Sequence, residues 1–220
     1  MIQLPRLYAI LDATFCPTIE ELIAFADELF AGGCTLLQYR NKLGNARVML
    51  EQARALKRHL GSHPNVAKSA TLGWATHGSV RLIMNDRADL CLAADFDGVH
   101  VGQDDLSPES VRKIIGPERW LGVSTHSPEQ VREADLTSAD YLAIGPVFST
   151  SSKENLDPVV GLEGVRRARA LTRKPLVAIG GITRANAASV IEAGADSVAV
   201  ISDLLREPRK SAEEFFRILG

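Results

Sequence analysis

Cationic side chains are spaced in this sequence in a way that suits binding of an anion. Arg40 and Lys42 follow Gln38 at every second position, which is the spacing at which side chains of a strand project to one side. An arginine fork matches two phosphate oxygens, and a lysine adds a point charge. The three residues predict a strand end that binds phosphate. The alternative is an ordinary strand end whose Arg and Lys are simply exposed to solvent.

Two carboxylates each come shortly after an apolar run: Asp86 after residues 81–84, and Asp105 after residues 98–101. Neighbouring strands lie about 4.8 Å apart, so side chains at the ends of such strands can approach closely. Two carboxylates at such a short distance repel each other. Mg²⁺ relieves this repulsion and keeps coordination positions for phosphate oxygens. The pair therefore predicts a Mg²⁺ site, and the alternative is that each Asp caps the helix that follows it.

A second set of anion-binding features lies later in the chain. Residues 145–153 are rich in hydroxyl groups and end in Lys153, which favours a loop that closes on a phosphate. Gly180 and Gly181 follow one apolar run, and Ser202 follows the next. Glycines let backbone N–H groups approach a phosphate closely. A plain solvated loop and a tight turn are the alternatives, but together the segments favour a second phosphate site.

The histidines carry less information. His100 stands between two valines within an apolar run, which is typical of an interior, hydrogen-bonded residue rather than a metal ligand. His126, close to Ser124, is open to a functional role, but no Ser-His-Asp pattern accompanies it.

Eight short apolar runs must position these side chains. They are rich in Val, Ile and Leu without strict alternation, which is typical of parallel strands covered by helices. Strand–helix alternation repeated eight times predicts an α/β fold, a (β/α)8 TIM barrel, as a single domain over residues 1–220. The expected strands are residues 7–11, 34–39, 81–84, 98–101, 120–123, 141–144, 175–179 and 197–200.

Helix-start signals separate the runs. Thr18 and Glu21 form a capping box, and Ser127 is expected to form another with Gln130. The alternative fold, an open doubly wound sheet, would place a glycine-rich GxGxxG turn after the first strand, where the chain instead reads DATF. Residues 61–80 predict a loop insertion at the bottom of the barrel, away from the strand ends that build the active site of this fold.

Composition excludes several classes of protein. The net charge of -2 and the pI near 6.2 give no basic surplus for nucleic acid. Three cysteines without CxxC spacing favour a reducing compartment over a disulfide framework or a zinc site. No leader and no apolar run near the ~20 residues of a membrane helix is found. We therefore expect a cytoplasmic protein that binds neither nucleic acid nor membranes; the oligomeric state, homo-oligomer included, stays open.

Six segments, in this order, give the chain a strong likeness to a known family. From Leu7 to Ser202 it resembles thiamine phosphate synthases. The matching segments are QYRNK at 38–42, NDR at 85–87, GVHVGQDD at 98–105, GVSTH at 122–126, GPVFSTSSK at 145–153 and AIGGIT at 178–183.

The resemblance implies a transferase that joins a hydroxymethylpyrimidine diphosphate to a thiazole phosphate and releases diphosphate. It implies Mg²⁺ at Asp86 and Asp105 and requires no protein nucleophile. The residues implied for the pyrimidine diphosphate are Gln38, Tyr39, Arg40, Asn41, Lys42, Asn85, Ser124 and Lys153, with Arg40, Lys42, Ser124 and Lys153 as the expected catalytic groups. Those implied for the thiazole phosphate are Thr150, Ser151, Ser152, Gly181, Ile201 and Ser202.

The sequence departs from the family pattern at two positions, and other functions of the same barrel have to be compared with the synthase. The family usually has Glu at Asn41 and Thr at Ser152. A related thiazole tautomerase carries a His where Pro146 stands here. A sugar-phosphate epimerase would leave the cluster of cations unexplained, and a barrel that only binds thiamine precursors would be marked by loss of the metal carboxylates, which are both present. The synthase is the favoured interpretation.

Overall fold

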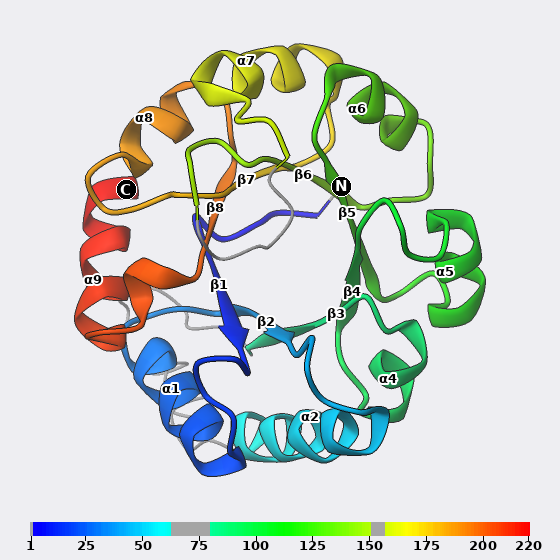
Figure 1. The fold of residues 1–220 in the computed structure, drawn as a ribbon, viewed down its shortest axis with the longest axis vertical. Coiled ribbons are helices and arrows are strands. Elements are labelled where there is room, and N and C mark those ends of the chain that lie inside the picture. Colours follow the sequence, from blue (N-terminus) through cyan, green and yellow to red (C-terminus); the bar gives the residue numbers. More distant parts are fainter. Residues whose placement is uncertain (1, 63–79, 151–156) are drawn as a thin grey trace.

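A closed parallel barrel of eight strands forms the centre of the computed structural model, which describes residues 2–62, 80–150 and 157–220 (Figure 1). The strands follow one another around the barrel in chain order, and β8 pairs with β1 through Leu7 and Val198. This closure excludes the open doubly wound sheet. The strands are β1 Leu7–Asp12, β2 Leu36–Arg40, β3 Arg81–Asn85, β4 Gly98–Val101, β5 Trp120–Thr125, β6 Tyr141–Ile144, β7 Leu176–Ile179 and β8 Ser197–Val200.

Helices surround the barrel and cover the outer face of the sheet (Figure 1). None of the helices in the described ranges is long and apolar enough to cross a membrane. They are α1 Ile19–Ala31, α2 Ala46–Gly61, α4 Ala88–Ala93, α5 Pro108–Ile115, α6 Pro128–Asp135, α7 Gly161–Leu171, α8 Ala187–Glu192 and α9 Pro208–Leu219, with a short 3₁₀ helix, η1, at Ser202–Leu204.

All eight predicted strands are present, and several extend further than expected. β1, β2, β3 and β5 run on into the polar residues that follow their apolar cores. Parallel pairing holds these residues in place, as the register of Asp12 with Arg40 shows. Strand ends therefore carry part of the candidate site, including Arg40, Asn85 and Ser124.

The predicted helix caps are correct in one case and half correct in the other. Thr18 accepts from the backbone N–H of Glu21 at 3.2 Å, and the Glu21 carboxylate accepts in return from Thr18 N at 3.1 Å, which completes the box. Ser127 caps α6, but the Gln130 side chain accepts from His126 N at 2.6 Å instead of from Ser127. The prediction of a second capping box was therefore wrong, because the backbone N–H that donates to the Gln130 side chain belongs to His126 and not to Ser127.

Strand alternation divides the buried side chains into two layers. One layer packs between strands and helices, and a smaller one fills the barrel interior, where Tyr8, Ile10, Leu36 and Tyr141 belong to one cluster. Because residues two apart on a strand share a face, Gln38 lies on the interior side with Leu36. Tyr39 lies on the helix side, in the outer cluster.

Candidate active site

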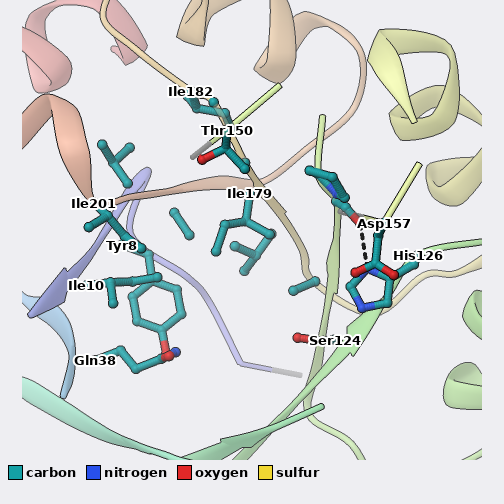
Figure 2. Close-up of a pocket in the computed structure, with 18 of the residues that line it drawn as sticks. Tyr8, Ile10, Gln38, Ser124, His126, Thr150, Asp157, Ile179, Ile182 and Ile201 are labelled. Carbon is teal, nitrogen blue, oxygen red and sulfur yellow. Dashed lines mark hydrogen bonds and ion pairs between the residues drawn. The ribbon is translucent and has the colours of Figure 1, made fainter. Parts of the chain in front are cut away.

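A cavity of about 510 Å³ opens at the C-terminal ends of the strands. Residues from every strand line its wall or rim, and Figure 2 shows Tyr8, Gln38, Ser124 and Ile179 among them. The lower wall is apolar, with Ile10, Val177 and Ile179 among its residues, and polar groups converge above it. Such a cavity at this end of a barrel is the usual place for an active site.

Arg40 reaches this cavity from β2 and is held there by a buried carboxylate. Its guanidinium forms an ion pair with Asp12 at the end of β1, whose side chain is only 2% exposed. Asp12 also accepts from Thr14 N at 2.9 Å. Removing either partner would leave a buried charge uncompensated. Asp12 was not among the predicted site residues, because only the pairing of β1 with β2 brings it to Arg40.

Tyr39 and Asn41 do not face the cavity, although sequence analysis placed them with the substrate-binding residues. The Tyr39 hydroxyl donates to Gln52 of α2 at 2.5 Å, and Asn41 donates to the same Gln52 oxygen at 2.9 Å. Burial raises the pKa of Tyr39 to about 12. The physical reason is the strand alternation that turns Gln38 and Arg40 inward. A side-chain contact with substrate is not supported for either residue.

The two predicted metal carboxylates lie close together in the segments that follow β3 and β4, with Asp86 directly after the cavity-lining Asn85. Asp86 forms an ion pair with Lys42, and Asp105 accepts from Gly102 N at 2.7 Å. Partial burial raises the pKa of Asp105, and the neighbouring Asp86 adds to the rise, while Gly102 and Lys42 oppose it. Neither Asp caps a helix, because α4 begins after Arg87 without a side-chain cap and Ser107 caps α5.

These carboxylates fit a magnesium ion chemically. Asp86, which directly follows the cavity-lining Asn85, adopts φ 62°, a left-handed conformation that is uncommon outside glycine. In the described ranges, no group of three or more His, Cys, Asp or Glu side chains is placed to hold a metal ion. Two carboxylates that leave the other positions to water and phosphate oxygens are what Mg²⁺ prefers. Burial is the main cause of the raised pKa of Asp105 and repulsion from Asp86 adds to it, and a divalent cation would relieve that repulsion.

Gln38, Asn85 and Ser124 face the cavity from three strands. Asn85 is the last residue of β3. Ser124 Oγ lies 2.9 Å from His100 Nε2, and Gln38 donates to the Tyr8 hydroxyl at 2.7 Å. His100 is thus an interior, hydrogen-bonded residue, as the sequence indicated.

The opposite rim consists of backbone and hydroxyl groups. Thr150, Gly181, Ile201 and Ser202 all line the cavity there. Gly181 has φ 63°, and a Cβ at this position would lie 2.5 Å from the Ser149 carbonyl oxygen, so the turn requires glycine.

An ion-pair network outside the cavity joins the turns that follow β7 and β8. Arg184 donates to Asp203 Oδ2 from its backbone N at 2.8 Å and from Nε at 3.0 Å, and it also pairs with Glu214 of α9. These carboxylates raise the pKa of Arg184, so the guanidinium stays charged. The network links the turn that contains Gly181 to the residue after Ser202, and no signal in the sequence indicated it.

His126, left open by the sequence, lies at the edge of the cavity. Its Nδ1 is 2.6 Å from the Gly145 carbonyl oxygen and 3.5 Å from Asp157 Oδ2 (Figure 2). Three other predicted site residues, Ser151, Ser152 and Lys153, lie outside the described residues.

Comparison with known proteins connects this cavity to a family. The model of the thiamine monophosphate synthase family matches residues 7–204. A thiamine-phosphate synthase of Koribacter versatilis is 58% identical over 99% of this chain and 97% of its own length. A thiamine-phosphate synthase of Shouchella clausii is 38% identical over 91% of this chain and 88% of its own length.

Solved structures give the same relation. The thiamine phosphate pyrophosphorylase of Pyrococcus furiosus superposes with a TM-score of 0.80 at 33% identity, covering 97% of this chain and 95% of its own. The A-subunit of tryptophan synthase from the same organism reaches a TM-score of 0.70 at 14% identity, which shows a shared barrel fold and nothing more.

Proposed function

The chain belongs to the thiamine monophosphate synthase family and has its transferase activity, and from that premise we propose how its barrel carries the reaction out. A hydroxymethylpyrimidine diphosphate and a thiazole phosphate are joined to give thiamine phosphate and diphosphate. The observation that carries the proposal is the rim at the ends of β2 and β3, where Arg40 and Asn85 line the cavity and Lys42 pairs with Asp86, which lies close to Asp105.

We assign the diphosphate to this rim. Arg40, oriented by Asp12, offers two N–H donors to phosphate oxygens, and Lys42 adds a point charge. Lys153, from the loop after β6, is the third cation that we assign. Asp86 and Asp105 would hold Mg²⁺, which when bound neutralises charge on the diphosphate oxygens.

The pyrimidine ring then lies deeper in the cavity. Gln38 and Ser124 are hydrogen-bonding groups of the cavity wall, and Asn85, the last residue of β3, also lines the cavity. We assign these three residues to the pyrimidine diphosphate. Ile10 and Ile179 line the same cavity, where they exclude water from the ring.

The thiazole phosphate takes the opposite rim. Backbone N–H groups at Gly181, Ile201 and Ser202 and the hydroxyl of Thr150 are suited to bind its phosphate. We assign Ser151 and Ser152 to the same phosphate. The network of Arg184 and Asp203 holds the two turns in register for this task.

Charge determines the order of events. The bond between the methylene carbon and the diphosphate oxygen breaks, and its electron pair leaves with the diphosphate, where Arg40, Lys42 and Lys153 stabilise the added negative charge. The electron-rich aminopyrimidine stabilises the resulting methylene cation. The thiazole nitrogen donates its lone pair to that carbon, forms the new C–N bond and becomes the thiazolium of the product. No proton transfer and no protein nucleophile are needed.

The test measures diphosphate release from both substrates together, with Mg²⁺ or with EDTA. We expect release only with both substrates and metal, loss of release in Asp105→Ala, and retention in Asp104→Ala, which removes the neighbouring exposed carboxylate. Equal activity in the two variants would refute the metal assignment. Binding of the thiazole phosphate without release of diphosphate under any condition would point to a tautomerase or a binding protein.

We also propose a cytoplasmic location. The support is that Cys16, Cys34 and Cys91 are all buried and unpaired, as suits a reducing compartment.

A further inference from the structure

A chain of hydrogen bonds runs through the barrel interior beneath the cavity. Gln38 Nε2 donates to the Tyr8 hydroxyl at 2.7 Å, and Tyr8 lies 3.0 Å from the hydroxyl of Tyr141. Tyr141 lies 3.1 Å from His100 Nδ1, and His100 Nε2 lies 2.9 Å from Ser124 Oγ. The chain thus joins two residues of the cavity wall, Gln38 and Ser124, through the interior.

Tyr141 is the central member of this chain and is buried below the cavity. It is 1% exposed, whereas Tyr8 and His100 also line the cavity. Its hydroxyl meets His100 directly above Gly122, which pairs with His100 on one side and with Tyr141 on the other. A Cβ at Gly122 would overlap both the Tyr141 ring and His100 Nδ1. The strand therefore leaves out a side chain at the position where the two groups meet.

The partners of Tyr8 determine the direction of the hydrogen bonds. Its oxygen accepts from the Gln38 amide, and within the described ranges the other partner recorded for its hydroxyl is Tyr141. The Tyr8 proton therefore goes to Tyr141, because a buried donor without an acceptor is costly. The Tyr141 proton then goes to His100 Nδ1. Burial raises the pKa of both phenols, so each keeps the proton that this order requires.

The direction of these hydrogen bonds determines which groups both ends of the hydrogen-bond chain offer to the cavity. With Nδ1 as the acceptor, a neutral His100 carries its proton on Nε2 and donates it to Ser124 Oγ. The Ser124 hydroxyl proton is then available to the cavity. At the other end, the bond from Nε2 to Tyr8 leaves the carbonyl oxygen of Gln38, which lines the cavity, available to accept. The reverse order would present the opposite pair, an amide N–H at Gln38 and an acceptor at Ser124.

We propose that Tyr141 is a positioning residue that orders these protons, and thereby fixes Gln38 as an acceptor and Ser124 as a donor toward the substrate. An exocyclic amino group donates to Gln38, and a ring nitrogen or a phosphate oxygen accepts from Ser124. The network thus selects an aminopyrimidine over the corresponding oxopyrimidine, whose oxygen would need a donor at Gln38. This selection rests on the proposed function, because it assumes that the pyrimidine lies at these two residues.

The first test reads the proton order without any substrate. Protein labelled with ¹⁵N-histidine is examined by long-range ¹H–¹⁵N NMR at neutral pH, and the His100 signals are identified by their loss in His100→Asn. We expect a neutral ring with the proton on Nε2 in the wild type, and a changed tautomer population in Tyr141→Phe. A proton on Nδ1 in the wild type, or an unchanged spectrum in Tyr141→Phe, would overturn the proposal.

The second test reads selectivity by calorimetric binding of the amino- and oxopyrimidine diphosphates with Mg²⁺. In Tyr141→Phe we expect the affinity ratio between the two to fall by about 10–100-fold, by analogy with the loss typical when a residue that orients a metal ligand is replaced. Thr172→Val is the control, since it also removes a buried, hydrogen-bonded hydroxyl but lies before β7, at the opposite end of the barrel. An equal ratio in the two variants would overturn the selection.

The two tests separate the possible failures. If Tyr141→Phe does not fold, the wild-type tautomer still decides the proton order. If the wild type releases no diphosphate, the proposed function fails while the tautomer measurement stands. If Ser124→Ala abolishes the effect of Tyr141→Phe on the affinity ratio, the effect acts through Ser124, and strict additivity of the two changes would contradict that route.

Discussion

The ion pair between Asp12 and Arg40 allows a sharp prediction. Asp12→Asn keeps the shape of the side chain and its bond from Thr14 N, and removes only the negative charge that faces the guanidinium. Arg40 then loses its fixed orientation at the cavity. The substitution therefore tests whether a residue that lies behind Arg40 contributes to binding the diphosphate.

The magnitude follows from the burial of the pair. Asp12 is 2% exposed and Arg40 15%, so solvent screens the interaction little. A hydrogen bond to a charged group contributes about 1.5–3 kcal/mol and a neutral one about 0.5–1.5 kcal/mol, so we expect a loss of about 1–2 kcal/mol in unfolding free energy. In a chain of this size that corresponds to a Tm lower by about 2–8 °C. We expect KM for the pyrimidine diphosphate to rise about tenfold or more, with KM for the thiazole phosphate unchanged.

Calorimetric unfolding and steady-state kinetics with each substrate varied in turn provide the assay. Asp95→Asn is the matched control, because Asp95 pairs with Arg119 but is 78% exposed. A surface pair of this kind contributes about 0–1 kcal/mol, so neither Tm nor KM should change much. If Asp12→Asn leaves both KM values unchanged, or raises both equally, Asp12 does not position Arg40 for the diphosphate.

Three further predictions concern the other parts of the site. Lys153→Ala should lower kcat by about 10²–10³-fold if this lysine stabilises the leaving diphosphate, while Lys113→Ala on α5 should leave it unchanged; single-turnover rates decide. Gly181→Ala places a Cβ against Ser149 at φ 63° and should raise KM for the thiazole phosphate about tenfold or more with little change for the other substrate, and equal changes for both would argue against the assigned phosphate site. Because the pKa of Asp105 is raised, its proton competes with Mg²⁺ at a higher pH than for an ordinary aspartate, so calorimetric Mg²⁺ affinity should fall as the pH is lowered toward that pKa, and an affinity independent of pH would contradict the assignment.

The strands were the predictable part of the fold. Their apolar runs are continuous because parallel strands are covered on both faces, and this signal does not depend on distant residues. Where the prediction of the second capping box failed, the choice between His126 and Ser127 as the partner of Gln130 depended on the local path of the backbone. Sequence spacing alone does not distinguish such neighbours.

For Tyr39 and Asn41, the residue spacing and the family resemblance led to different predictions of which way the side chains point. The spacing of Gln38, Arg40 and Lys42 already placed Tyr39 and Asn41 on the other side of the strand. The family resemblance, by contrast, carried over the whole segment as one motif. The structure agrees with the spacing, because the side chains of Tyr39 and Asn41 donate hydrogen bonds to Gln52 of α2.

The supporting residues could not be found from the sequence, because they meet only after the barrel closes. Tyr8 and Tyr141 are 133 positions apart, and Asp12 and Arg40 are 28 apart. Each looks like an ordinary strand residue in its own segment. Gly122 was quoted only as part of a motif, and its role becomes visible when the neighbouring strands place His100 and Tyr141 beside it.

A crystal structure with an unreactive pyrimidine diphosphate analogue, and with Mn²⁺ in place of Mg²⁺, tests directly which rim binds the diphosphate and the metal. We expect an anomalous peak between Asp86 and Asp105, diphosphate oxygens on Arg40 and Lys42, and the pyrimidine ring against Gln38 and Ser124. A diphosphate bound on the Gly181 and Ser202 rim, or a metal ion away from both carboxylates, would contradict this assignment.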